Sequence, residues 1–185
     1  MDLGFRMHAE RTPNPNSIKW VLGQTVADDS GSASFSKDVT AEISPLAASI
    51  FETEGVLGVF FGPTFITVTK AEKMEWTDLA VPIVAAIKAW AATGESAFGP
   101  AYVPPEKADD DEVTARIRTI LERDVRPYVE ADGGEIVFVG YRDGVVEVVL
   151  QGACAGCPSS SITLKLGIEA RLKEEIPEVR SVVAL

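Results

Sequence analysis

The segment DVRPYVEADGGEIVFVGYRDGVVEVVLQGACAGCPSSSITLKLGIEARL, residues 124–172, decides the fold of the C-terminal half of the chain. Apolar residues dominate 136–139 and 145–150, and the turn-forming residues 142–144 (Arg-Asp-Gly) lie between them. This pattern predicts two antiparallel strands joined as a β-hairpin. A loop with two cysteines follows the hairpin, and a helix then begins with its N-cap among the serines 159–161.

The elements on either side of this segment complete one small domain. Apolar residues at helical spacing predict a helix before the hairpin; they are Val113, Ile117, Ile120, Leu121 and Val125. Pro127 is expected to kink or end that helix, because proline removes a hydrogen bond and clashes with the preceding turn. Residues 179–183 predict a final strand. The C-terminal domain, residues 111–185, therefore has the predicted order helix, strand, strand, helix, strand.

A change in composition separates this domain from the N-terminal half. Residues 94–111 read GESAFGPAYVPPEKADDD, with three prolines, two glycines and an acidic run, which suits neither a helix nor a strand. We therefore predict a flexible linker over residues 95–110. It joins an N-terminal domain, residues 1–94, to the C-terminal domain.

The N-terminal half also mixes helices and strands. Its expected elements are strands over 18–21, 56–61 and 65–69 and helices beginning at Ser44-Pro45 and at Thr77. The predicted fold class is thus α+β, in two small domains. This half shows no catalytic constellation. Its polar residues Asn14, Asn16 and Lys19 suit contacts with a partner and ordinary turn or surface roles equally well.

The composition argues against several classes of protein. The 185 residues are 46% hydrophobic and 24% charged, which suits a folded globular protein, and no apolar run approaches the ~20 residues of a membrane span. The formal net charge of −11 opposes binding to nucleic acid or to anionic membranes. The N-terminus lacks the apolar core of a secretory signal. We therefore predict no nucleic-acid or membrane partner.

The two cysteines carry the chemistry of the sequence. Cys154 and Cys157 are the only cysteines, and their Cys-x-x-Cys spacing lets two sulfurs reach one metal centre. The loop precedes a helix, whose unpaired N–H groups stabilise thiolates, the form that binds metal. Structural zinc and iron–sulfur clusters usually take four protein ligands. The single histidine, His8, is interpreted as a solvated surface residue, so the two cysteines leave the site incomplete. Two chains around a twofold axis, or small-molecule thiols, would complete the site.

Other interpretations of the cysteine pair stay open from the residues alone. The two side chains would also fit a packing role as buried cysteines without a ligand. A thioredoxin-like dithiol also lies between a strand and a helix, but the strand–helix alternation expected ahead of that motif is missing here. Two thiolates per chain also suit zinc.

The quoted segment closely resembles the C-terminal domain of the Nfu family, the NifU-like iron–sulfur scaffolds and carriers. The matching motifs are Arg126-Pro127, Asp132-Gly133-Gly134, Gly144-Val145-Val146 and the run from Gly152 to Ser160. The N-terminal half is similar to the family's amino-terminal domain at residues 12–16, 44–47 and 65–68, with Trp20 where phenylalanine is expected. Together the two resemblances cover nearly the whole chain outside the linker and the N-terminus.

The resemblance implies a [4Fe–4S] cluster bridging a homodimer, with Cys154 and Cys157 as ligands. A [2Fe–2S] cluster stays open, because two thiolates per chain suit it as well. Upstream cluster assembly proteins would supply the cluster and recipient apo iron–sulfur proteins would receive it, so an enzyme is not expected. The alternatives are a thioredoxin-like thiol–disulfide oxidoreductase or a zinc-binding Cys-x-x-Cys module. For Asp132-Gly133-Gly134 we favour a turn role over a role near the cluster. The expected location is a bacterial cytoplasm, and the alternative is the mitochondrial matrix, as a mature form.

Overall fold

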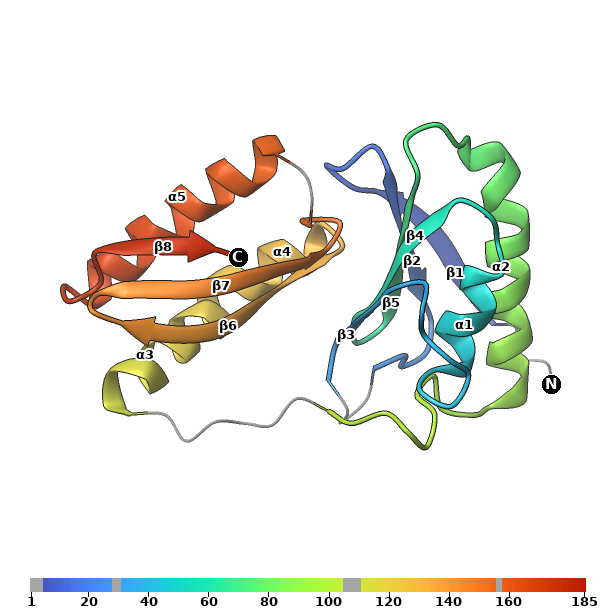
Figure 1. The fold of residues 1–185 in the computed structure, drawn as a ribbon, viewed down its shortest axis with the longest axis horizontal. Coiled ribbons are helices and arrows are strands. Elements are labelled where there is room, and N and C mark those ends of the chain that lie inside the picture. Colours follow the sequence, from blue (N-terminus) through green and yellow to red (C-terminus); the bar gives the residue numbers. More distant parts are fainter. Residues whose placement is uncertain (1–4, 28–30, 105–110, 156–157) are drawn as a thin grey trace.

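The structure, a computed structural model, describes residues 5–27, 31–104, 111–155 and 158–185, without the side chains of 158–161. It contains two units that lie side by side, each built from helices packed on a β-sheet (Figure 1). One sheet has five strands and the other has three. The predicted α+β class is therefore confirmed.

The N-terminal unit is an antiparallel sheet with strands in the order β1-β2-β5-β4-β3. Its strands are β1 (Met7–Arg11), β2 (Ser17–Leu22), β3 (Ala33–Phe35), β4 (Val56–Phe61) and β5 (Phe65–Lys70). The three predicted strands are β2, β4 and β5. The two edge strands, β1 and β3, were not predicted, because short edge strands carry few apolar residues in alternation.

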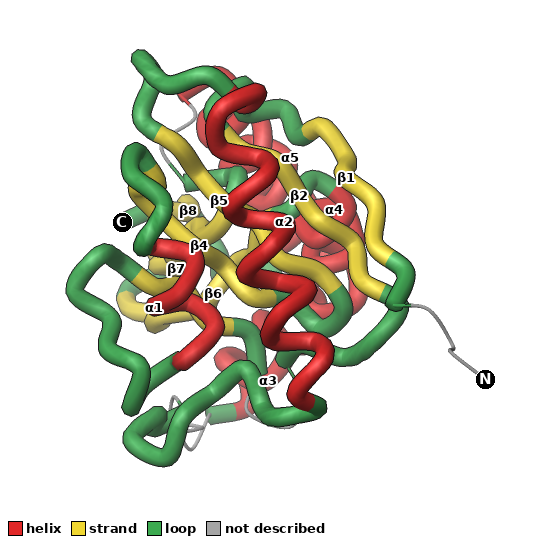
Figure 2. Tube along the Cα trace, turned by 90° about the vertical axis from the view of Figure 1, so that its right-hand side faces the viewer, coloured by secondary structure: helices red, strands yellow, loops and turns green. Residues whose placement is uncertain are grey.

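Two helices cover one face of this sheet, α1 (Pro45–Phe51) and α2 (Trp76–Thr93). Figure 2 shows them together in front of the strands. The predicted start of α1 is confirmed: the Ser44 side chain accepts a hydrogen bond from Ala47 N–H at 3.1 Å, and Pro45 occupies the first turn. Ile50, Ile83 and Ile87 from the helices are fully buried against the sheet.

The C-terminal unit has a three-stranded sheet in the order β6-β7-β8. Strand β6 (Gly134–Arg142) pairs antiparallel with β7 (Val145–Gly152), and β8 (Ser181–Ala184) runs parallel to β7 after the crossover helix α5 (Pro158–Glu175). The predicted hairpin is confirmed. Asp143 and Gly144 both have positive φ, 51° and 80°, which is the geometry of a tight two-residue hairpin turn. The predicted cap among serines 159–161 falls on side chains outside the described part.

The first helix of this unit is interrupted, as expected from the presence of Pro127. It runs as α3 (Glu112–Ile120), a π-helical turn η1 (Leu121–Val125) and α4 (Arg126–Ala131). Pro127 lies in the first turn of α4, where its missing N–H removes the least hydrogen bonding. The wide turn η1 absorbs the break in the helical ladder just before it.

The segment predicted as the linker 95–110 differs from expectation in its first half. Ala97 and Phe98 are buried in the core of the N-terminal unit, and Ser44 Oγ donates a hydrogen bond to Ala97 O at 2.7 Å. The Phe98 and Tyr102 rings pack with centroids 4.3 Å apart. The N-terminal unit thus extends to Tyr102, because two aromatic side chains in the segment have a sheet edge to pack on.

Within the described residues, no helix has the length and hydrophobicity needed to cross a bilayer.

Candidate functional site

Cys154 lies in the turn that follows β7 and precedes α5. Its side chain is only 7% exposed and packs in the hydrophobic core of the C-terminal unit. Cys154 is therefore part of the packed core and not of an exposed loop. The turn is drawn inward because Ala153 N–H donates a hydrogen bond to Gly133 O at 3.1 Å. Cys157 lies outside the described residues.

Two glycines make room for this turn. Gly133 has a φ of +77°, a conformation that other residues rarely adopt, and it ends the turn after α4. A Cβ on Gly134 would lie 2.6 Å from Cys154 Sγ and 2.7 Å from Gln151 O, closer than atoms can approach. The segment Asp132-Gly133-Gly134 thus forms the expected turn, and it also lies directly beside the sulfur.

Cys154 lines a cavity of about 380 Å³. Apart from Cys154, the cavity is lined by Pro13, Tyr128, Val129, Asp132, Thr163 and Leu164. Most of these side chains are apolar, so Cys154 borders a largely apolar space. Pro13 belongs to the N-terminal unit, so both units contribute to the walls.

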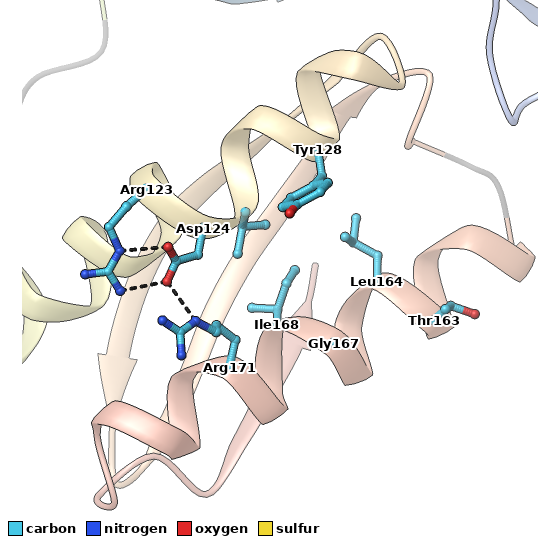
Figure 3. A pocket seen from close by; sticks show the side chains of 9 residues that line it. Arg123, Asp124, Tyr128, Thr163, Leu164, Gly167, Ile168 and Arg171 are labelled. Carbon is cyan, nitrogen blue, oxygen red and sulfur yellow. Dashed lines mark hydrogen bonds and ion pairs between the residues drawn. The ribbon is translucent and has the colours of Figure 1, made fainter.

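A longer groove of about 560 Å³ continues from this cavity between α5 and the η1–α4 helix (Figure 3). Tyr128 and Leu164 line both spaces and lie on opposite sides of the groove. Tyr128 is 73% exposed, and Ile162 and Leu166 on α5 are 63% and 61% exposed. The exposed ring of Tyr128 therefore lies in the groove beside the cysteine turn, and α5 exposes two further apolar side chains, a feature typical of surfaces that bind another protein.

The far end of the groove is closed by charged side chains (Figure 3). Asp124 accepts hydrogen bonds from Arg123 and Arg171, each at 2.7 Å. These bonds, first that of Arg123, lower the pKa of Asp124 to about 2. The carboxylate is therefore ionised at neutral pH and ties η1 to α5.

Three polar side chains of the N-terminal unit reach the backbone around the cysteine turn. Asn14 Nδ2 donates to Ala153 O at 3.2 Å, and Thr67 Oγ1 donates to Gly133 O at 2.7 Å. Lys19 Nζ donates to the carbonyls of residues 130 and 131, at 2.9 and 3.2 Å. Asn14 and Lys19 were open candidates for partner contacts, and their partner here is the other half of the same chain. No pattern in the sequence singled out Thr67.

Among the described residues, Cys154 supplies the thiol of the site, and Cys157 follows three residues later in the sequence. His8 lies on β1, exposed and hydrogen-bonded to Glu10 at 3.0 Å, which fits the predicted surface residue. Among the described residues, no three His, Cys, Asp or Glu side chains gather as a metal site. A soft thiolate donor in an apolar cavity suits a thiophilic metal centre. The residues therefore fit an iron–sulfur cluster or zinc, with further ligands supplied from elsewhere.

Comparison with known proteins identifies both halves of the chain. Residues 117–183 match the family described as NifU-like domain, and residues 7–94 match the family described as scaffold protein Nfu/NifU N terminal. A solution NMR structure of a NifU-like protein from Saccharomyces cerevisiae is 22% identical, with a TM-score of 0.47 over 53% of this chain and 89% of that chain.

Two named relatives match along almost the whole chain. The human protein named mitochondrial NFU1 iron-sulfur cluster scaffold homolog is 43% identical over 183 residues, which is 95% of this chain and 70% of the relative. The protein of the same name from Drosophila sechellia is 41% identical over 179 residues. The chain spans 63% of the length of that Drosophila relative. On this match the chain belongs to the Nfu family of NifU-like proteins.

Proposed function

We propose that this protein is an iron–sulfur cluster scaffold and carrier. In this proposal a [4Fe–4S] cluster is held between two copies of the chain by Cys154 and Cys157 of each copy, and is then transferred to apoproteins. The observation that carries the proposal is the Cys154 thiol, set in an apolar cavity at the end of β7 and followed three residues later by Cys157. The names of the relatives, which describe iron–sulfur cluster scaffolds, support the same chemistry.

The proposed dimer follows from ligand number. An iron–sulfur cluster usually takes four cysteine ligands, and each chain has two cysteines. A second copy related by a twofold axis supplies the other two thiolates. The exposed apolar groove beside Cys154 offers this second copy, or a recipient protein, a surface to bind. A [2Fe–2S] cluster satisfies the same ligand count.

A site shared between two chains suits an iron–sulfur cluster that must later be transferred to another protein. A recipient thiolate can replace one protein ligand at a time, because no single chain encloses the cluster. No substrate is chemically converted in this scheme, so we propose a carrier and not an enzyme. Upstream assembly proteins and recipient apo iron–sulfur proteins are its proposed partners.

The proposed location follows the relatives. Their names include the word mitochondrial, which supports the predicted alternative of the mitochondrial matrix. The bacterial cytoplasm stays a prediction.

Anaerobic reconstitution with iron and sulfide tests the proposal. We expect an apo monomer to become a dimer with one cluster per two chains, measured by light scattering and by iron and sulfide analysis. Mössbauer spectroscopy then distinguishes a [4Fe–4S] cluster from a [2Fe–2S] cluster. A holo monomer with a complete cluster and no added thiol would contradict the shared site. Iron-independent reduction of insulin disulfides would instead support the thioredoxin-like alternative.

A further inference from the structure

The N-terminal sheet has one face without helices, and this face lies against the C-terminal unit (Figure 1). Strand β7 contacts both β4 and β5. Neighbouring residues of a strand point to opposite faces, so Trp20, Ile66 and Phe61 join the core under the helices while Lys19, Thr67 and Phe60 face the other way. The sheet register pairs Lys19 with Thr67 and Thr67 with Phe60, so these three side chains form one row across β2, β5 and β4.

This row receives two glycines of the C-terminal unit. A Cβ on Gly133 would lie 3.0 Å from Thr67 Oγ1 and 3.2 Å from Lys19 Cβ. A Cβ on Gly152 would lie 3.0 Å from Phe60 Cδ1. Both glycines have positive φ, +77° and +64°, so they bring bare backbone against the sheet. Both glycines lie beside the turn that carries Cys154, since Ala153 follows Gly152 in the chain and its N–H donates a hydrogen bond to Gly133 O.

The apolar side chains of this face are buried by the contact itself. Phe60 and Phe65 are 2% and 4% exposed. Among the described residues, the hydrophobic cores of the two units are built from other side chains and include neither of them. Their rings lie 5.8 Å apart, and Lys19 Nζ lies 4.7 Å from the centre of the Phe65 ring. Separation of the units would therefore expose two phenylalanines to water.

The polar side chains of this face are also satisfied by the contact. Lys19 is 9% exposed, and its ammonium group donates to two carbonyls at the end of α4. Thr67 and Asn14 donate to Gly133 O and Ala153 O. All these interactions end within a few residues of the cysteine turn or of the glycines beside it.

From these contacts we infer that the N-terminal unit is a cap for the cysteine turn of its own chain. The docked cap holds Cys154 in its buried position, with Asn14 fixing Ala153 and Pro13 walling the cavity before the thiol. Release of the cap frees the turn to present its thiolates to a cluster shared with a second copy. The role of this movement rests on the proposed function, whereas the docking surface stands on the contacts alone. Contacts of this mixed polar and apolar kind between domains are commonly reversible.

The cap is tested in the apo protein, by the rate at which a maleimide labels Cys154. The full-length chain carries Cys157→Ser, so that only one thiol reacts. Lys19→Met leaves two carbonyls without their donor in the docked state, and we expect labelling to be faster by about tenfold or more. Thr67→Val removes one neutral hydrogen bond at constant shape, and an increase of about threefold to tenfold is expected. Lys88→Met, at an exposed lysine of α2, is the matched control and should label like the parent.

Small-angle scattering on the same proteins reports whether the units separate. We expect a larger radius of gyration for Lys19→Met than for Lys88→Met, with unchanged helix and strand content by circular dichroism. If Lys19→Met does not fold, the labelling rate of Thr67→Val against the control tests the cap. Equal labelling rates in the parent, the two cap variants and the control would overturn the cap.

These measurements need no iron, so they separate the cap from the proposed function. If the protein takes up no cluster but the variants label faster than the control, the cap is supported and the proposed cluster-carrying function is not. If the protein takes up one cluster per dimer and all variants label at the same rate, the proposed function is supported and the cap is not.

Discussion

Gly134 shows how much of the candidate site depends on the size of one residue. Its Cα faces Cys154 Sγ and Gln151 O, with no room for a methyl group between them. Because its φ is not in the left-handed region, a substitution here tests space and not backbone strain.

We expect Gly134→Ala to displace the cysteine turn and to lower the free energy of unfolding by about 1–3 kcal/mol, as overpacking does. Cluster occupancy after reconstitution should fall as well. Gly167→Ala is the control, because a Cβ at this position of α5 meets nothing within 4 Å. That change should stabilise the helix, by up to about 1 kcal/mol. Urea unfolding compares the two variants, and equal stability would show that the turn accommodates the methyl group.

Cys154 is both a proposed ligand and a core residue, so its substitution has two effects. Cys154→Ala should abolish stable cluster binding and leave a folded protein. Cys154→Ser should abolish binding too, but the buried hydroxyl should further lower stability, by about 1–3 kcal/mol. Iron and sulfide analysis measures the first effect and urea unfolding of the apo protein the second. Normal cluster content in either variant would refute the ligand assignment.

At the scale of elements, the groove between η1 and α5 is held by ion pairs. Asp124 binds Arg123 and Arg171, and Arg171 also binds Glu175 at 2.6 Å. The pKa of Asp124 is lowered to about 2, below the ordinary 3.8, so the folded state binds this proton less tightly than the unfolded chain. The ion pairs therefore stabilise the fold above pH ~4, and this contribution is lost as the pH falls toward ~2.

Asp124→Asn should accordingly lower stability at pH 7 and lose its effect between about pH 4 and pH 2. Chemical unfolding of parent and variant across this range measures the difference. Glu174→Gln, which removes a more exposed partner of Arg171, is the control and should show a smaller change. A constant difference between parent and Asp124→Asn at every pH would exclude the ionised carboxylate as the cause.

Elements with a local signal were predictable from the sequence, and contacts between elements were not. The Ser44 cap, the hairpin turn at Asp143-Gly144 and the break near Pro127 depend on the conformational preferences of single residues. The docking face was missed because alternation in β2 shows only that Lys19 points away from the core of its own unit. A side chain that points away from one core can face water or another domain, and period-two alternation is the same in both cases.

The candidate site was found only in part for the same reason. Cys154 could be identified from its spacing to Cys157, but its burial depends on Gly134 and on a hydrogen bond to Gly133 that forms only in the folded chain. The linker was predicted from prolines and glycines. The same segment contains Phe98 and Tyr102, and large aromatic side chains such as these contribute strongly to packing on a neighbouring sheet.

At the scale of the whole molecule, the division of labour between the two units can be tested by separating them. The C-terminal unit has its own hydrophobic core, with Ile117, Leu172, Ile176 and Val182 fully buried. A fragment from Asp110 to Leu185 should therefore fold without the N-terminal unit. It should be only marginally stable, because so short a domain buries little surface.

We expect this fragment to dimerise and to hold one cluster per two chains, as the full-length protein does. Cluster uptake should be faster in the fragment, because no cap must leave the cysteine turn first. Transfer to several apoproteins should be slower or less selective, because the proposed cap would also be the surface that positions recipients. Iron and sulfide analysis gives the stoichiometry, and activation of an apo-aconitase-type acceptor gives the transfer rate. Lys19→Met in the full-length chain is the matched comparison, since it should share the fast uptake while keeping the N-terminal unit. A fragment that folds but holds no cluster would show that the N-terminal unit helps to build the site, and the cap would then be part of the ligand-binding structure.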